Sequence, residues 1–498
     1  MRRKRSSVAN HKNKFMRRLI VTLFCSVVLL SGCVTHPDRE AVTERIESEF
    51  ARGNFSEVTH LADSLRGVFR DDTLLMTLLD SLQDQSMRIR HDFSLSETDV
   101  QEQLRTIFKE FRPEEQQQWE NLNWLEYRNI DGEKRYFRRA ASNLKRILDH
   151  QTLLKDPEKI LTPDDFDLFK MDHAAAVICS AGDAHSPLIP VPMKLKYTLS
   201  VNADAIPTGE IIRCWMPWPR EVHPRQKEVR LIRTSPEKHF IAPDTLMQRS
   251  LYMEQPAVAG QPTLFEMEFS FTPSAHYSDP QVLVVSTCDK NSGVYAAYTG
   301  EQKPHILFSE KIKELADRVV GSEQEPLKIV QAIFNWIDTN IPWAGALEYS
   351  TIPNIPEYVI DNRRGDCGMK TLLFMTLARY RGVPVKWQSG WMLHPGKVNL
   401  HDWCEVWFDQ VGWVPLDISF GRLPSDNPVI RDFYMTGMDS WRLIVNDNIG
   451  APFVPGKKFP RSEPNDFQRG EVEWSGGNLY FDKWDYHMEV DYLPPPGK

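Results

Sequence analysis

The sequence has no apolar run long enough to cross a membrane comfortably. Its main apolar stretch, residues 19–30, covers 12 positions, whereas a transmembrane helix needs about 20 residues. Paired cysteines are also missing. Five cysteines follow Cys33, an odd number without a Cys-x-x-Cys pair: Cys179, Cys214, Cys288, Cys367 and Cys404. At least one thiol is therefore expected to be free or paired with another molecule.

The chain also lacks an excess of positive charge. The eight Lys and Arg residues before position 19 belong to a stretch without acids, and without them 52 basic residues face 68 acidic ones, a net charge of −16. A chain this acidic is a poor candidate for nucleic-acid binding. Hydrophobic residues make up 41% and charged residues 26%, which is ordinary globular usage, so no long stretch is expected to be disordered.

The first 32 residues have the layout of a signal peptide. The basic stretch leads into the apolar run, which ends in Leu30-Ser31-Gly32-Cys33. This ending resembles the lipobox of bacterial lipoproteins, which implies diacylation of Cys33, cleavage before it, and a lipid anchor in the cell envelope, facing the periplasm or the surface. The alternative is an ordinary signal peptide with an incidental cysteine.

The rest of the chain predicts an α+β, multidomain protein. Helical periodicity dominates residues 33–189, apart from a hairpin around Asp131-Gly132. From about 190 to 304 the period changes to two, which predicts a β-sandwich-like module. Residues 305–425 hold the motifs described next. Residues 426–498 form an extension rich in proline and aromatic residues, and its segments 474–480 and 484–492 suggest a terminal hairpin packed against the core. Pro217-Trp218-Pro219 is better explained as a packed turn than as a ligand platform.

The first motif is Gly365-Asp366-Cys367-Gly368, which opens an apolar helix that Gly382 ends. Asp366 is a good N-cap and places Cys367 at the first helical position. Unpaired backbone N–H groups and the helix dipole favour a thiolate there. Cys367 is therefore a candidate nucleophile, although a buried structural cysteine is the common alternative.

The second and third motifs read as two adjacent strands. In residues 401–407, His401, Trp403, Glu405 and Trp407 share one face of the first strand, and Cys404 points to the other. This spacing argues against a zinc site that uses His401 and Cys404 together, and no metal or cofactor is expected. Gly412 to Asp417 follow a short turn, so antiparallel pairing would bring Asp417 within reach of His401. Structural or solvated roles are favoured for Asp402 and Glu405, and His394 is interpreted as a loop bystander.

Together, in this order, the three motifs resemble the transglutaminase-like superfamily, over residues 305–425. The resemblance implies a papain-like fold in which Cys367 is the nucleophile, His401 the base and later acid, and Asp417 the residue that orients the imidazole. It also implies an upstream tryptophan that assists the reaction, for which Trp343 is the nearest candidate; a core role for Trp343 is the alternative. Gly368-Met369-Lys370, and Ile418-Ser419 in place of the family's frequent Pro-Thr, depart from the common pattern and weaken any transfer of substrate preference.

The sequence thus predicts an envelope-anchored, cysteine-dependent acyl-transfer enzyme acting on a protein, peptide or glycopeptide. Hydrolysis of a peptide or amide bond is favoured over transamidation because water always reaches an exported acyl-enzyme. The main alternative is a non-catalytic lipoprotein that binds peptides or glycans, and a zinc hydrolase ranks third. The sequence predicts no particular oligomeric state, and it leaves open whether the N-terminal helices cover the site.

Overall fold

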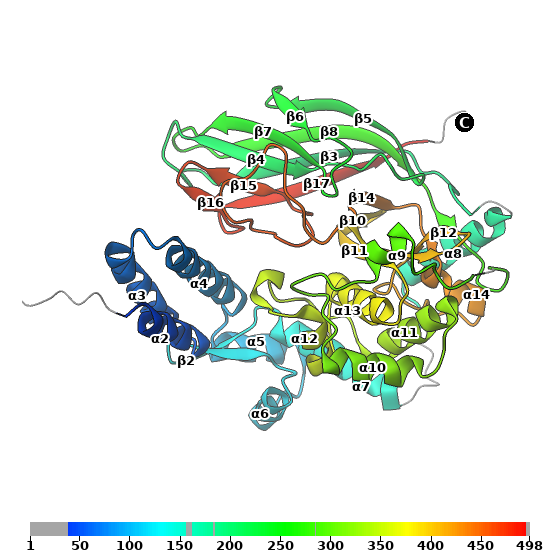
Figure 1. The fold of residues 1–498 in the computed structure, drawn as a ribbon, viewed down its shortest axis with the longest axis horizontal. Helices are drawn as coiled ribbons and strands as arrows, with labels where there is room; N and C mark the ends of the chain where they lie inside the picture. Colours follow the sequence, from blue (N-terminus) through cyan, green and yellow to red (C-terminus); the bar gives the residue numbers. More distant parts are fainter. Residues whose placement is uncertain (1–37, 156–161, 183–184, 284, 495–498) are drawn as a thin grey trace, which may run out of the picture. The chain divides into compact units, whose positions relative to one another are not determined.

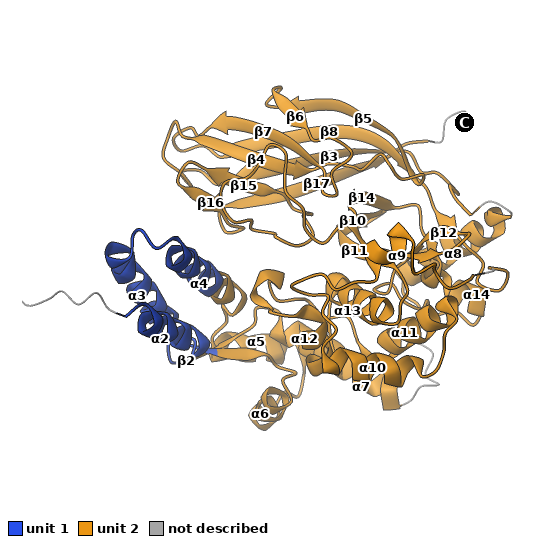
Figure 2. Cartoon of the chain, viewed as in Figure 1, with its two compact units in different colours: residues 1–87, 129–133 blue, residues 88–128, 134–498 orange. Residues whose placement is uncertain are grey.

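A computed structural model describes residues 38–155, 162–182, 185–283 and 285–494. The expected signal peptide, 1–32, and the expected lipidation site, Cys33, lie outside the described residues. The chain divides into two compact units (Figure 2): residues 1–87 with 129–133, and residues 88–128 with 134–498. The mixture of helices and sheets confirms the predicted α+β class.

The first unit is built from helices, as its 3.6-residue periodicity predicts. Its elements are α2 (Arg39–Ala51), α3 (Phe55–Val68) and the first part of α4 (Thr73–Asp92). Their apolar stripes meet in one small core, formed by Ile46, Val58, Ala62, Leu65, Leu75, Leu79 and Leu82. Gly53, at a φ of 79°, makes the turn between α2 and α3, where a side chain would collide with the carbonyl oxygen of Asn129.

The hairpin predicted around Asp131-Gly132 is present. It joins β1 (Tyr127–Ile130) to β2 (Glu133–Tyr136), and both turn residues have positive φ, 50° and 83°, as a two-residue hairpin turn requires. The helices of the second unit that precede its sheets are α5 (Glu97–Ile107), α6 (Pro113–Asn121), α7 (Ala140–Lys155) and α8 (Asp165–Ala181).

Two antiparallel sheets form the predicted sandwich (Figure 1). One has the order β16-β15-β4-β7-β6, and the other has the order β17-β3-β8-β5. The strands run β3 (Met193–Val201), β4 (Ile211–Pro217), β5 (Gln226–Ser235), β6 (His239–Ile241), β7 (Ser250–Pro256), β8 (Thr263–Pro273), β15 (Glu471–Trp474), β16 (Gly477–Leu479) and β17 (Trp484–Tyr492). Alternate residues of β3 and β8 are buried between the sheets, so period-two patterning builds this core. Trp218 is buried there too, which supports the packed-turn interpretation.

The last segment of the chain is part of this sandwich rather than a separate extension. β15 pairs with β4, and β17 pairs with β3 along its whole length, from Trp484↔Val201 to Tyr492↔Met193. The aromatic segments 474–480 and 484–492 predict a terminal hairpin, in which neighbouring strands would pair with each other. Only β15 and β16 do so; β17 instead fills the free edge of β3, about 290 residues away in sequence.

A third antiparallel sheet, in the order β12-β11-β10-β14, carries the motif residues. Its strands are β10 (Val385–His394), β11 (Lys397–Phe408), β12 (Gly412–Leu416) and β14 (Arg442–Asn446). Trp391, Leu443 and Val445 pack into the sandwich core. Gly390 lies opposite His401, and any side chain there would collide with the Leu443 carbonyl of β14. A glycine is therefore required where β14 approaches β10.

Helix α13 (Cys367–Tyr380) packs on β10 and β11 and is surrounded by α10 (Glu310–Val320), α11 (Pro326–Asn340) and α12 (Ile355–Asn362). Nearly every residue of α13 from Gly368 to Arg379 is buried. This explains why the apolar residues of α13 are spread around the whole helix instead of lying on one face. Short elements complete the unit: β9 (His276–Tyr277), α9 (Gly293–Tyr298), η1 (Tyr349–Thr351), α14 (Pro428–Arg431), η2 (Phe433–Met435) and β13 (Gly437–Met438).

Within the described ranges, no helix is both long and apolar enough to span a bilayer. All five cysteines after Cys33 are free thiols, which agrees with their odd number and spacing.

Candidate active site

The local structure around Cys367 is the one its motif predicts. Asp366 is the N-cap of α13, and its carboxylate accepts a hydrogen bond from the Met369 N–H at 3.1 Å. The Tyr349 hydroxyl donates to the same carboxylate at 2.5 Å. Cys367 is therefore the first residue of the helix, at the end where unpaired N–H groups can stabilise negative charge.

The Cys367 thiol has an unexpected neighbour. Its Sγ donates to Oδ2 of Asp402 at 3.1 Å, and Asp402 is only 2% exposed. Burial, followed by the charges of Asp402 and Asp366, raises the pKa of Cys367 well above its usual value. These effects outweigh the stabilisation of a thiolate by the helix N-terminus. The resting side chain is therefore a protonated thiol and not the thiolate that the motif alone favours.

His401 and Asp417 form the pair that the two strands were expected to bring together. His401 Nε2 lies 2.7 Å from Asp417 Oδ2, and both side chains are buried. The bond occupies Nε2, which leaves Nδ1 as the ring nitrogen available to a reacting group. Burial lowers the pKa of His401, while Asp417 acts in the opposite direction. The resting imidazole is therefore neutral, as a base must be.

The Asp417 carboxylate is held by three further groups. It accepts hydrogen bonds from the backbone N–H groups of Ser419 and Phe420, both at 2.9 Å, and Arg442 Nη2 lies 3.0 Å away. Burial alone would raise its pKa, but His401 and Arg442 lower the pKa of Asp417 to about 2. Lys370 is also near, since the charges of Asp338 and Asp417 act on its buried amine. Asp417 is thus a fixed anion at neutral pH.

Gln468 connects the two neighbouring residues of β11. Its Nε2 donates to the His401 carbonyl at 2.8 Å and to Asp402 Oδ1 at 2.7 Å. Gln468 belongs to the connection between β14 and β15, residues 447–470, which leads from the sheet that carries His401 to the sandwich. Gln468 is far from the motifs in sequence and has no motif of its own, so the sequence carries no signal for it. Arg442 was missed for the same reason.

A cavity of about 220 Å³ opens at the thiol. Cys367, Asp366, Asp402 and Trp343 line it, whereas His401 does not. Trp343 forms a parallel bridge with Gly365 and lies beneath the Arg146 guanidinium, 4.5 Å from its ring centre. The resemblance pointed to this tryptophan, and the structure places it on the wall of the cavity that Cys367 also lines.

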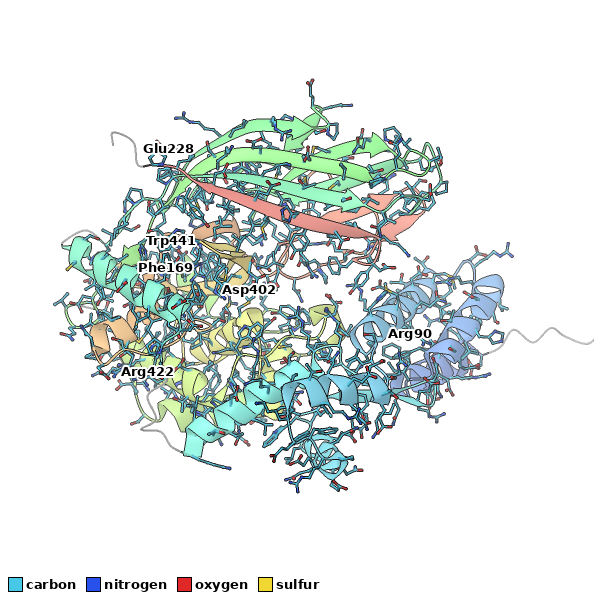
Figure 3. All side chains as sticks on the ribbon, turned by 180° about the vertical axis from the view of Figure 1, so that it is seen from behind. Arg90, Phe169, Glu228, Asp402, Arg422 and Trp441 are labelled. Carbon is cyan, nitrogen blue, oxygen red and sulfur yellow. The ribbon has the colours of Figure 1, made fainter. Side chains whose placement is uncertain are left out.

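Asp402 and Glu405 are not solvated, which removes one of the two roles expected for them. Glu405 is 5% exposed, and its carboxylate lies 2.8 Å from Lys386 Nζ, so it is structural. Asp402 instead contacts the thiol; Figure 3 labels it in the interior of the molecule. The signal that could have identified Asp402 is its position beside His401 in a strand that faces the Cys367 helix.

His394 is the last residue of β10 and not a loop residue as expected. It is fully buried, with Nε2 3.3 Å from Asp439 Oδ2, and its ring packs against Phe166 and Trp441. Pro395-Gly396 made a loop plausible, but these residues form the turn after the strand. Helix α8 covers this region through Phe169, whose ring centre lies 4.7 Å from that of Trp441 (Figure 3).

One group of side chains in the described residues has the spacing of a metal site: His223, Glu405 and Asp447. It lies apart from the residues that line the cavity at Cys367. Cations already occupy its carboxylates, because Arg220 Nε lies 2.8 Å from Asp447 and Lys386 Nζ lies 2.8 Å from Glu405. A divalent ion would have to compete with these fixed positive charges, so the group is better explained as a buried ion-pair network.

Comparison with known proteins agrees with this geometry. Residues 313–418 match the model of the transglutaminase-like superfamily. One curated relative is an uncharacterised protein, YebA of Bacillus subtilis (strain 168), 22% identical over 151 residues, which are 26% of this chain. The chain spans about a fifth, 20%, of the length of that relative.

Two solved structures are similar over longer stretches. A candidate cysteine protease from Cytophaga hutchinsonii is 14% identical, with a TM-score of 0.42, and the match covers 62% of this chain and 93% of that one. The periplasmic domain of TgpA from Pseudomonas aeruginosa is 15% identical, with a TM-score of 0.23, covering 50% and 92%. The family match, which includes Cys367, His401 and Asp417, shows that this chain carries a transglutaminase-like domain.

Proposed function

We propose that this protein is a cysteine-dependent acyl-transfer enzyme that hydrolyses a peptide or amide bond in the bacterial cell envelope. One observation carries the proposal: the transglutaminase-like domain holds a buried His401–Asp417 pair, 2.7 Å apart, next in sequence to the residue that contacts the Cys367 thiol. A nucleophile, a base and an orienting carboxylate are the parts that acyl transfer needs.

In the proposed reaction, Nδ1 of His401 takes the Cys367 proton as the sulfur attacks the substrate carbonyl. Asp417 and Arg442 keep the imidazole oriented and stabilise its positive charge. The Cys367 N–H, at the start of α13, donates to the developing oxyanion, with Trp343 on the facing wall. The imidazolium then protonates the leaving amine, and water resolves the thioester and regenerates the thiol.

Envelope anchoring through Cys33 is the second part of the proposal. It rests on the basic and apolar segments before Leu30-Ser31-Gly32-Cys33. Lipidation at Cys33 would place the catalytic domain outside the cytoplasm, where water is the acceptor always present. This setting favours hydrolysis over transamidation.

The test is to trap the acyl-enzyme. The mature protein is mixed with an activated ester, p-nitrophenyl acetate, and the acetylated residue is located by mass spectrometry. We expect the label on Cys367, no label there in Cys367→Ala, and labelling about 10²- to 10⁴-fold slower in His401→Ala. Cys179→Ala is the matched control because Cys179 is an exposed free thiol. Acetylation of Cys179 in place of Cys367 would contradict the proposal, and so would a Cys367 labelling rate that is the same in His401→Ala as in the wild type. Either result would favour a binding role.

A further inference from the structure

We propose that the cavity at Cys367 recognises a primary ammonium group of the peptide substrate, with Asp402 and Asp466 as its carboxylate partners. This inference rests on the proposed function because it assigns a substrate class to the same site. It concerns binding, however, so it can fail or succeed independently of the catalytic step.

The charge of the cavity wall is the first argument. Five carboxyl groups and three arginines line it: Glu348, Asp366, Asp402, Glu463 and Asp466, with Arg138, Arg139 and Arg469. Two of the carboxyl groups have a cationic partner, since Glu463 accepts from Arg469 Nε at 2.9 Å and Glu348 lies 3.8 Å from Arg88. In the part of the chain that the structure describes, no lysine, arginine or histidine nitrogen lies within 4.0 Å of the other three carboxylates.

The second argument is an unpartnered atom. Asp466 is only 7% exposed, yet its Oδ1 is buried without a hydrogen-bond partner among the described residues. A buried carboxylate oxygen without a donor loses its hydration and gains nothing in return. Burial and the nearby charge of Asp402 raise the pKa of Asp466 well above its usual value. A donor with a positive charge would supply both missing interactions.

The backbone holds Asp466 firmly in this costly place. Its carbonyl oxygen accepts from Asn446 Nδ2 and, at 3.4 Å, from the Ser389 hydroxyl, and its N–H donates to the Ile449 carbonyl at 3.0 Å. Its φ is 75°, and that of Phe467 is 52°, in the left-handed region that non-glycine residues rarely adopt. The backbone hydrogen bonds and this conformation therefore fix the position of Asp466 beside the cavity.

An ammonium group suits the cavity better than a bare metal ion does. Within the described residues, no metal-binding group with all its ligand atoms within 4.8 Å of one another is formed by these four side chains: Cys367, Asp366, Asp402 and Asp466. They come from three separate segments and surround a space instead of converging on a point. An ammonium presents three donors on a compact head. The cavity volume, about 220 Å³, is below the range of about 300–1,000 Å³ found for sites that bind drug-sized ligands. It suits a single ammonium-bearing group of a peptide.

The ammonium is assigned to the acyl donor, as an α-amino or side-chain amine near the bond that is cleaved. The carboxylates lie at the nucleophile itself, because Asp402 Oδ2 is 3.1 Å from Cys367 Sγ. A group bound there is present while Cys367 attacks, and so belongs to the molecule that is attacked. A separate amine that later accepts the acyl group has the same chemistry, and the experiment below distinguishes the two.

The binding test uses full-chain Cys367→Ala, in which no acyl transfer can occur. n-Butylamine and its neutral analogue 1-butanol are titrated by calorimetry. We expect butylamine to bind at least about tenfold more tightly than butanol, and Asp466→Asn to remove this preference. Glu348→Gln is the matched control, since Glu348 lines the same cavity but already has a cationic neighbour; it should change butylamine affinity less than twofold. Butylamine affinity should also rise with pH as the carboxyls ionise.

Equal binding of butylamine and butanol would overturn the inference and would leave the proposed function intact. Thermal unfolding of each variant verifies folding, and Asp402→Asn serves if Asp466→Asn is unfolded. The source of the amine is then tested with the wild-type enzyme. Preference for an alanyl-glutamine anilide with a free α-amino group over its N-acetyl form, by about tenfold in kcat/KM, supports the donor assignment. Butylamine incorporated into the product would overturn it in favour of the acceptor.

Discussion

The Cys367 thiol donates its hydrogen bond to Asp402 and not to the imidazole of His401. The two candidates are adjacent in sequence, but successive residues of a strand point to opposite faces. The His401 side chain therefore turns to Asp417, and Asp402 faces the thiol. In the proposed reaction, proton transfer from sulfur to Nδ1 requires the thiol to leave Asp402. The hydrogen bond to Asp402, together with the burial that raises the pKa of Cys367, keeps the resting thiol protonated.

Asp402→Asn should activate the thiol towards alkylation. Removing a negative charge next to Sγ favours the thiolate, so the pKa of Cys367, which burial and Asp402 raise, should fall. The rate of iodoacetamide modification between pH 6 and 10, read on the peptide that contains Cys367, measures this change. Glu405→Gln is the control, since Glu405 is a buried acid on the same strand whose neighbour is Lys386. If both variants keep the wild-type profile, Asp402 does not hold the thiol proton.

The second prediction concerns Asp417 and acid stability. Its pKa is lowered from the usual 3.8 to about 2. A carboxyl whose pKa is depressed by folding stabilises the protein above its unfolded pKa, and this contribution, about 2 kcal/mol, is lost as the pH falls towards the folded value. The difference in unfolding free energy between wild type and Asp417→Asn should therefore shrink by that amount from pH 5 to pH 2 in urea titrations. A difference that is independent of pH would show that Asp417 is not the anion described.

Residues close together in sequence could be predicted, and residues joined only by tertiary structure could not. The N-cap at Asp366 and the His401–Asp417 pair follow from a capping pattern and from two strands with a short turn. Gln468, Arg442 and Asp466 come from segments with no motif, and the sheet order alone brings them to the site. The pairing of β17 with the edge of β3 could not be predicted either. Strand periodicity indicates which face of a strand is buried, but not which other strand it pairs with.

The reactivity of Cys367 shows a different limit. Its position at the start of α13 predicts a stabilised thiolate, and that position is correct. The helix end contributes only about 0.3–1 kcal/mol at ordinary sites. Burial and the carboxylates of Asp402, Asp366 and Asp466 act against it by raising the pKa of Cys367, and of these only Asp366 lies beside Cys367 in the sequence.

Trp343 provides a third prediction. Trp343→Phe should keep the ring beneath Arg146 but remove the indole N–H, so kcat should fall about a hundredfold with little change in KM if this group stabilises the oxyanion. The control is Trp336→Phe, because Trp336 also lies beneath an arginine, Arg363, but does not line the cavity. Equal kcat values for the two variants and the wild type would assign Trp343 to packing.

Lipidation at Cys33 can be tested apart from catalysis. In Cys33→Ser the acyl chains have no attachment point, and each buried methylene contributes about 0.8 kcal/mol of membrane affinity. We expect the wild-type protein to partition into the detergent phase with labelled fatty acid incorporated, and the variant to lose both properties. Retention of the label by Cys33→Ser would place the anchor elsewhere, and an unlabelled wild type would indicate an ordinary signal peptide.

The last prediction concerns the C-terminal strand as a structural part of the sandwich. Trp484 is 2% exposed, and its indole N–H donates to the Leu479 carbonyl at 2.9 Å. It belongs to the core that the sandwich shares with Trp391 of β10. Trp484→Ala should lower the unfolding free energy by about 3–5 kcal/mol, measured by urea denaturation. Asp485→Ala, one residue further on the exposed face of β17, should change it by less than about 0.5 kcal/mol. The sandwich and the sheet that carries His401 share one core. The acylation rate of Cys367 should therefore fall at the same urea concentration at which the sandwich unfolds. If the sandwich unfolds at a lower urea concentration than the one at which acylation is lost, the sandwich and that sheet unfold separately.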